Sequence, residues 1–194
     1  MKKTITTIAM LGMLLPSMAQ EVKTTFQTSS VWKPTIDVRA DAVMVYGTGS
    51  SPQISFQERV DSWRKQGYTT HFMTGIAWGG YSNYFTGKWD GKQHMDEGQK
   101  DMKGDTSLHN PGTPYIVPTL NYLKYFKETQ IKPVIDAGIS DIFLEEPEFW
   151  AYAGYSESFK REWETYYGFP WRAQHLSAEN TYLSNKLKYH LYFR

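Results

Sequence analysis

Short apolar runs alternate with helical patterns along this chain, and the runs are the first feature to place. Each is bounded by Gly, Pro or polar residues, as a buried strand is. The runs lie at 41–47 (DAVMVYG), 71–78 (HFMTGIAW), 115–118 (YIVP) and 139–144 (ISDIFL). Residues 20–40 are polar with no clear period, and we interpret them as a lead-in segment. The pattern therefore predicts four buried strands.

Four helices are predicted between and after these runs. Their capping residues are Ser55, Thr119, Ser156 and Ser177, and glycines end the first three at Gly67, Gly138 and Gly168. Pro133 lies inside the second helix and is expected to kink or split it, because proline lacks an N–H and crowds the preceding turn. The long loop from 79 to 112 is predicted to be ordered, since it is rich in aromatic residues.

The element order predicts the fold class. Strands that alternate with helices favour an α/β fold with a parallel sheet. Four strand–helix units are half of a (β/α)₈ TIM barrel, and the chain stops inside a helix whose apolar face includes Leu187 and Leu191. We expect residues 41–194 to be the N-terminal half of a TIM-barrel catalytic domain, in a fragment of a longer protein. The alternative is a complete, small doubly wound domain.

The N-terminus has the pattern of a secretory signal. Lys2 and Lys3 precede an apolar run at 5–15, and Ser17 and Ala19 have the small-residue spacing of a signal-peptidase site. We predict that residues 1–19 are a signal peptide and that the mature protein is periplasmic or secreted from a bacterium. An uncleaved anchor is the alternative. The sequence predicts no transmembrane segment after cleavage.

Composition narrows the function classes. The chain has no Cys, which excludes disulfide and thiolate chemistry, and a net charge of +1, which does not favour a nucleic-acid partner. It carries 7 Trp, 14 Tyr and 10 Phe. Such a content is typical of proteins that bind sugars or peptides on exposed rings, although a large aromatic core is the alternative.

Carboxylates crowd the end of the fourth predicted strand, at Asp141, Glu145, Glu146 and Glu148. Sites of α/β proteins gather at this end of the strands. Glu145 and Glu146 point to opposite faces, and Pro147 is expected to hold Glu146 in an extended conformation. The apolar rings of Phe149 and Trp150 favour the protonated form that a general acid needs. The alternative is a solvated acidic start of a helix.

The run FLEEPEFW at 143–150 resembles the fourth-strand motif of the (β/α)₈-barrel retaining glycoside hydrolases, in which Asn-Glu-Pro ends the strand. The stretch from 136 to 171 is similar to secreted barrel hydrolases of Bacteroidetes. The resemblance implies that Glu146 is the acid/base and that Glu145 stands in the place of the Asn, which touches a sugar hydroxyl. Glu145 and Glu148 are the alternative acid/base residues. The nucleophile would end strand seven, beyond the C-terminus of this chain.

Further residues are candidates for sugar contacts, by stacking of rings and hydrogen bonds to hydroxyls: Tyr46, Trp78, Trp89, Asp90, His94 and Trp150. Tyr46 and Trp78 could instead belong to a barrel core, and Trp89 could anchor a loop. No fixed metal-ligand spacing occurs, and we predict neither a metal nor a cofactor. The sequence thus predicts an exported glycoside hydrolase, with a non-catalytic carbohydrate-binding barrel or a barrel isomerase or lyase as alternatives.

Overall fold

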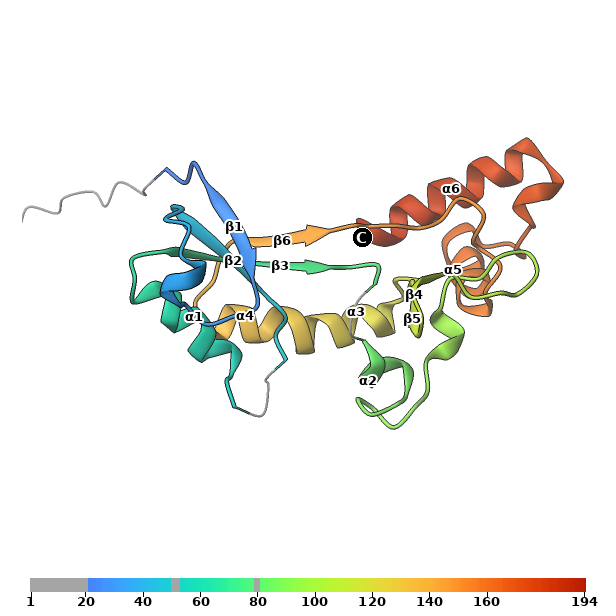
Figure 1. The fold of residues 1–194 in the computed structure, drawn as a ribbon. Coiled ribbons are helices and arrows are strands. Elements are labelled where there is room, and N and C mark those ends of the chain that lie inside the picture. The colour runs from blue at the N-terminus through green and yellow to red at the C-terminus, as the bar shows by residue number, and fades with distance from the viewer. Residues whose placement is uncertain (1–20, 50–52, 79–80) are drawn as a thin grey trace, which may run out of the picture.

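Four parallel strands form the main sheet of the computed structural model, which describes residues 21–49, 53–78 and 81–194. The sheet order is β1-β2-β3-β6, with β1 at Thr25–Thr28, β2 at Ala42–Tyr46, β3 at Thr69–Gly75 and β6 at Ile142–Glu145 (Figure 1). The prediction of an α/β fold with a parallel sheet is therefore confirmed. The predicted signal peptide at 1–19 lies outside the described residues.

The first strand corrects the interpretation of residues 20–40 as a lead-in. β1 has the sequence TFQT and alternates between exposed and half-buried positions, so no apolar run announces it. The Asp41 carboxylate, just before β2, accepts hydrogen bonds from the Thr24 backbone N–H at 2.9 Å and from its hydroxyl at 2.8 Å. Pairing with β2 therefore makes this polar segment a strand.

The predicted strand at 115–118 is the second correction, because it lies outside the main sheet. β4 (Leu108–Asn110) and β5 (Thr113–Pro114) form a separate antiparallel pair, and Ile116 makes an isolated bridge with Gly98. These residues are apolar because they are buried under other elements. The two errors cancel, so β6 is the fourth strand of the sheet as expected.

One face of the sheet is covered by α1 (Phe56–Arg64) and α4 (Lys132–Asp136). The Ser55–Glu58 capping box predicted for α1 is confirmed in full. The shared core contains Val43, Val45, Val60, Trp63, Phe72 and Val134, each 0% exposed. On β6, at the edge of the sheet, Phe143 and Leu144 are 43% and 51% exposed.

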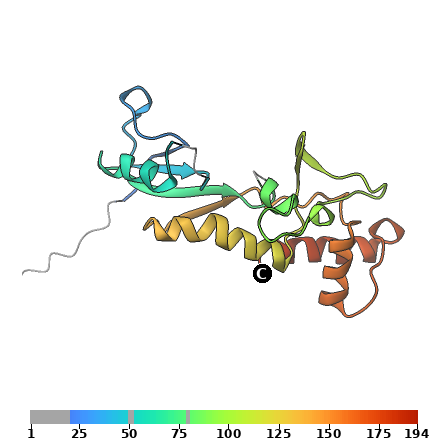
Figure 2. The ribbon, with the colours of Figure 1, turned by 90° about the horizontal axis from the view of Figure 1, so that it is seen from below.

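The helix predicted from Thr119 is interrupted where Pro133 requires it. It consists of α3 (Leu120–Phe126), a π-helical segment (Lys127–Ile131) and α4. The three follow one another as one long helix in Figures 1 and 2. A proline N–H would have bonded to the Thr129 carbonyl, four residues earlier. The Thr48 hydroxyl donates to this freed carbonyl instead, at 2.8 Å.

β1 and α1 lie near one end of this long helix, and the remaining elements lie toward its other end (Figure 2). They are α2 (Ser82–Phe85), α5 (Glu157–Tyr167), α6 (Ala178–Tyr192) and 3₁₀ turns at Met95–Glu97 and Gln174–Leu176; a further 3₁₀ turn, Pro34–Ile36, precedes β2. The segment predicted as an ordered loop contributes the buried Tyr81, Tyr84 and Phe85 to a second core. A third core joins Val117 to α5 and α6. In the described ranges, no helix has the length and apolar character that a membrane crossing requires.

Candidate functional site

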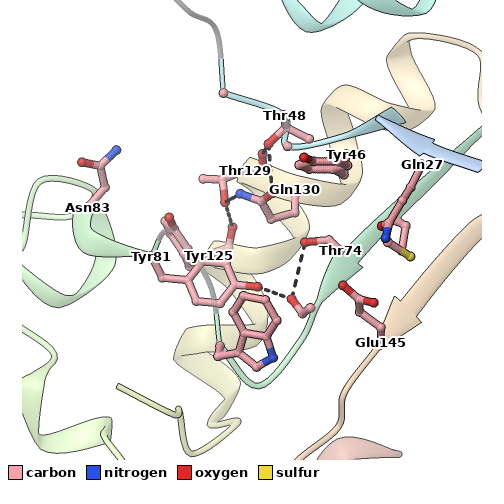
Figure 3. A pocket seen from close by; sticks show the side chains of 15 residues that line it. Gln27, Tyr46, Thr48, Thr74, Tyr81, Asn83, Tyr125, Thr129, Gln130 and Glu145 are labelled. Carbon is pink, nitrogen blue, oxygen red and sulfur yellow. Dashed lines mark hydrogen bonds between the residues drawn. The ribbon is translucent and has the colours of Figure 1, made fainter. Parts of the chain in front are cut away.

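A cavity of about 920 Å³ opens at the carboxyl ends of the parallel strands. All four strands or the residues just after them contribute to its wall, together with α2 and the π-helical segment (Figure 3). The lining residues are Gln27, Tyr46, Gly47, Thr48, Gly49, Met73, Thr74, Gly75, Trp78, Tyr81, Asn83, Tyr125, Thr129, Gln130 and Glu145. The structure thus brings together three of the predicted site residues, Tyr46, Trp78 and Glu145.

Hydroxyl and amide groups dominate one end of this cavity, where Tyr46, Thr48, Thr129 and Gln130 are grouped (Figure 3). The Thr48 hydroxyl lies 2.8 Å from the Thr129 carbonyl and 3.0 Å from the Gln130 side-chain oxygen. The sequence analysis missed Thr129 and Gln130 because they lie within a helical pattern. Pro133 was the available signal, since π-helical interruptions often mark functional sites.

Tyr81 closes the cavity near the end of β3. Its hydroxyl donates to the Gly75 carbonyl, and the side chain is 3% exposed. Burial raises the pKa of Tyr81 to about 12, and burial likewise raises the pKa of Tyr125. Both phenols therefore remain neutral hydrogen-bonding groups at neutral pH.

Glu145 is the last residue of β6 and lies on the cavity wall, beside Thr74 (Figure 3). It pairs with Gly75 in the sheet, and its carbonyl accepts from the Ile76 N–H at 3.1 Å. Among the described residues that line the cavity, Glu145 supplies the single carboxylate, and no Lys, Arg or His is present. The cavity is therefore polar but carries little charge.

Glu146 has a different backbone from the one predicted. Its φ is +51°, in the left-handed region, and the expectation of an extended conformation is wrong. The Glu148 N–H donates to the Glu146 carbonyl at 2.7 Å, so the chain turns tightly about Pro147 as it leaves the sheet. Non-glycine residues with positive φ cluster at functional sites. The exposed Glu146 carboxylate accepts from the Trp78 indole N–H.

Trp78 is held by its neighbours as well as lining the cavity. The His109 ring stacks on it at a centroid distance of 3.8 Å and an interplanar angle of 4°. His109 is hydrogen-bonded in turn to the Tyr115 hydroxyl, at 3.2 Å. One face of the indole is therefore covered by imidazole, and its N–H is directed at Glu146. The sugar contact expected of Trp78 stays a prediction.

Glu148 and Trp150 lie on the far side of Pro147. Burial and then a hydrogen bond with the Glu148 carboxylate raise the pKa of Tyr115. Trp150 is 37% exposed, packs edge-on against Tyr115 at 5.5 Å and stacks on Tyr152 at 5.9 Å. Neither Glu148 nor Trp150 lines the cavity.

Trp89, Asp90 and His94 belong to a separate cluster under α3, in which His94 is buried, Trp89 half-buried and Asp90 exposed. His94 is hydrogen-bonded to the Asp90 carboxylate and to the Asn121 amide, each at 3.1 Å, and it stacks on Tyr84 at 4.2 Å. The Trp89 indole N–H donates to Glu128 at 3.1 Å. These three residues do not line the cavity, and their expected sugar contacts stay predictions.

The described residues were compared with the pattern of a metal site, and the chain was compared with known proteins. Within the described ranges, no group of three or more His, Asp or Glu side chains is arranged to hold a metal ion. The candidate site is therefore the cavity with Glu145, flanked by Glu146 on Trp78. Comparison of the chain with protein-family models, with curated proteins and with solved structures gave no match.

Proposed function

We propose that the cavity binds carbohydrate and that the site belongs to an exported glycoside hydrolase. The observation that carries the proposal is the lining: among its described residues, hydroxyls, side-chain amides and aromatic rings surround a single carboxylate. Neutral polar groups match the hydroxyls of a sugar, and rings such as Tyr46 match its C–H faces. A phosphorylated or otherwise anionic ligand is disfavoured, because the described lining offers it no basic side chain.

The strand order supports a barrel as the frame of this site. The strands pair in the order in which they occur along the chain, all parallel. A doubly wound sheet has a point at which this order reverses, whereas a (β/α)₈ barrel does not. The cavity lies at the carboxyl ends of the strands, where barrel enzymes have their active sites.

The proposed roles follow from the placement of the two adjacent glutamates. Glu146 is the acid/base, as the resemblance to retaining glycoside hydrolases implies, and the Trp78 N–H orients its carboxylate. Glu145 accepts hydrogen bonds from sugar hydroxyls in the cavity. Bond cleavage begins when the acid donates a proton to the glycosidic oxygen as the bond to the anomeric carbon breaks.

Binding without hydrolysis is a second candidate function, and one observation favours it: Glu145, and not the proposed acid/base Glu146, lies on the cavity wall. A retaining mechanism needs a second carboxylate about 5–5.5 Å from the acid/base to act as nucleophile. The described lining provides one carboxylate, that of Glu145, to which we assign contacts with sugar hydroxyls; Glu146 follows it in the chain but does not line the cavity. A chain that binds glycans and cleaves no glycosidic bond would have this function.

Two measurements test the two candidate functions. Calorimetric titration of the chain with neutral oligosaccharides measures binding, and an assay with activated aryl glycosides measures hydrolysis. We expect binding that Tyr46→Ala and Glu145→Gln each weaken at least about tenfold, the effect of losing one good ring or hydrogen-bond contact. Tyr182→Ala is the matched control, because Tyr182 is 66% exposed on α6 and does not line the cavity. Equal affinities for all three variants would refute the cavity as the binding site.

A further inference from the structure

The segment that carries Glu146 and Glu148 leaves the sheet directly after Glu145. The Glu145 carbonyl still accepts from the Ile76 N–H of the neighbouring chain segment. The next residue, Glu146, has φ +51°. A residue other than glycine keeps such a backbone conformation only where its surroundings fix the chain on both sides. The sheet fixes it before Glu146, and something else must fix it after Pro147.

Gln99 provides this second attachment. Its side chain is 0% exposed, and its amide lies along the segment. Nε2 donates to the Glu148 carbonyl at 2.8 Å, and Oε1 accepts from the Trp150 N–H at 3.0 Å. A parallel strand bonds in the same way to a carbonyl and an N–H two residues apart. The side-chain amide therefore replaces the neighbouring strand that the segment no longer has.

The Gln99 amide is itself fixed from two directions. Its Nε2 also donates to the Ile116 carbonyl at 3.0 Å, and its backbone N–H donates to the Tyr115 carbonyl at 2.8 Å. From α6, the Tyr192 hydroxyl lies 3.0 Å from the Glu148 carbonyl and 3.1 Å from that of Ile116. The attachment thus joins the insertion between β3 and β6 to the last helix.

We propose that Gln99 is a positioning residue for the candidate acid/base. By holding the backbone at Glu148 and Trp150, it keeps the Glu146 carboxylate on the Trp78 N–H. The role in catalysis rests on the proposed function of Glu146, whereas the effect on geometry does not. Gln99 touches no substrate and acts only through the segment that it holds.

Nuclear magnetic resonance of the chain without any sugar tests the geometry. The reporter is the Trp78 indole N–H signal, assigned as the one lost in Trp78→Phe. Glu146→Gln should displace this signal in the parent chain, since the two side chains are hydrogen-bonded. In a Gln99→Met background, which keeps the side-chain length but removes the hydrogen bonds of the amide, including those to Glu148 and Trp150, Glu146→Gln should displace the signal little. An equal displacement in a folded Gln99→Met protein would overturn the proposal.

Gln174→Met is the matched control, because the Gln174 amide donates to the carbonyl of Ala151, the residue after Trp150, at 2.7 Å. It should leave the Trp78 signal and its response to Glu146→Gln unchanged. If Gln99→Met does not fold, Tyr192→Phe tests the same attachment, because it removes the other donor to the Glu148 carbonyl and a hydroxyl that lies 3.3 Å from Gln99 Nε2. In the Tyr192→Phe background, a reduced displacement of the Trp78 signal by Glu146→Gln supports the proposal. A displacement equal to that in the parent chain contradicts it.

The catalytic consequence is read separately. If the chain hydrolyses an aryl glycoside, Gln99→Met should lower kcat by up to about 10²-fold while KM changes little, because a displaced acid affects the chemical step. Coupling of Gln99 to Trp78 without any glycan binding would refute the proposed function and leave the positioning role intact. Glycan binding without this coupling would refute the positioning role alone.

Discussion

Two polar, aromatic regions of this molecule differ in how far their hydrogen bonds are satisfied internally. In the cluster under α3, the Glu97 carboxylate accepts from the Tyr84 and Thr119 hydroxyls, and His94 lies between Asp90 and Asn121. In the cavity, by contrast, Tyr46 is 42% exposed and Glu145 is half-buried, and both face open space.

This difference separates a structural cluster from a candidate binding site that is built of the same residue types. Buried polar groups that bond to one another stabilise one arrangement of the chain, and removing one of them leaves its partners unpaired. Polar groups that face a cavity bond to water and can exchange that water for a ligand. We therefore expect substitutions in the cluster to lower stability, and substitutions on the cavity wall to lower ligand affinity with little loss of stability.

The largest expected effect is that of Glu97→Ala. Glu97 is 6% exposed, and its loss leaves the Tyr84 and Thr119 hydroxyls without an acceptor. We expect the free energy of unfolding to fall by about 3 kcal/mol, measured by urea titration. Glu128→Ala is the control, since this glutamate accepts a hydrogen bond from the Trp89 indole N–H but is exposed, and its loss should cost under about 0.5 kcal/mol. Equal losses would show that burial of the accepting carboxylate does not set the cost of its removal.

Tyr81 lies on the border between the regions and predicts an alkaline effect. Its folded-state pKa of about 12 exceeds the ordinary value of 10.0. The folded protein therefore binds the proton more tightly than the unfolded chain, so this contribution is fully present below about pH 10 and is lost as the pH rises toward 12. We expect a loss of about 2 kcal/mol across that window in the parent. Unfolding titrations of Tyr81→Phe should show a shallower decline, and an identical slope would contradict the assignment.

Thr48→Val should have a moderate effect. The substitution removes the hydroxyl that satisfies the Thr129 carbonyl at the π-helical segment. We expect a loss of about 1 kcal/mol in the free energy of unfolding, because water from the cavity can reach the freed carbonyl. Thr165→Val on α5 is a useful comparison, since its exposed hydroxyl bonds only within its own helix. A loss near 3 kcal/mol would mean that this part of the cavity wall behaves like the buried cluster.

Glu145→Gln should change stability least, by about 0.5 kcal/mol or less, since the half-buried carboxylate faces the cavity. Thermal unfolding of the variant beside the parent measures this. A melting temperature that falls as much as in Glu97→Ala would show that Glu145 is structural. An unchanged melting temperature together with weakened glycan binding is the result that the comparison predicts.

Local signals were sufficient for the four predicted helices and for the strands β2, β3 and β6, but α2 lies in the segment predicted as a loop. The caps at Ser55, Thr119 and Ser177 accept the predicted backbone hydrogen bonds, because capping depends on residues only three apart. β1 could not be predicted, since its polar sequence becomes a strand only through pairing with β2 and through Asp41. The apolar run at 115–118 was misread because burial under other elements leaves the same pattern as burial in a sheet.

For the candidate site, the sequence by itself determined the residues that end strands. Tyr46 and Glu145 end β2 and β6 as lining residues of the cavity, because carboxyl ends of parallel strands meet at one edge. Trp78 also lines the cavity, but β3 ends at Gly75 and not at Trp78 as predicted. Only the tertiary structure decided the partners that hold the site: Thr48 on the Thr129 carbonyl, Trp78 on Glu146, and Gln99 on Glu148 and Trp150. Those contacts join segments from about 50 to about 80 residues apart. No local pattern encodes such contacts, because they depend on how the elements pack in space.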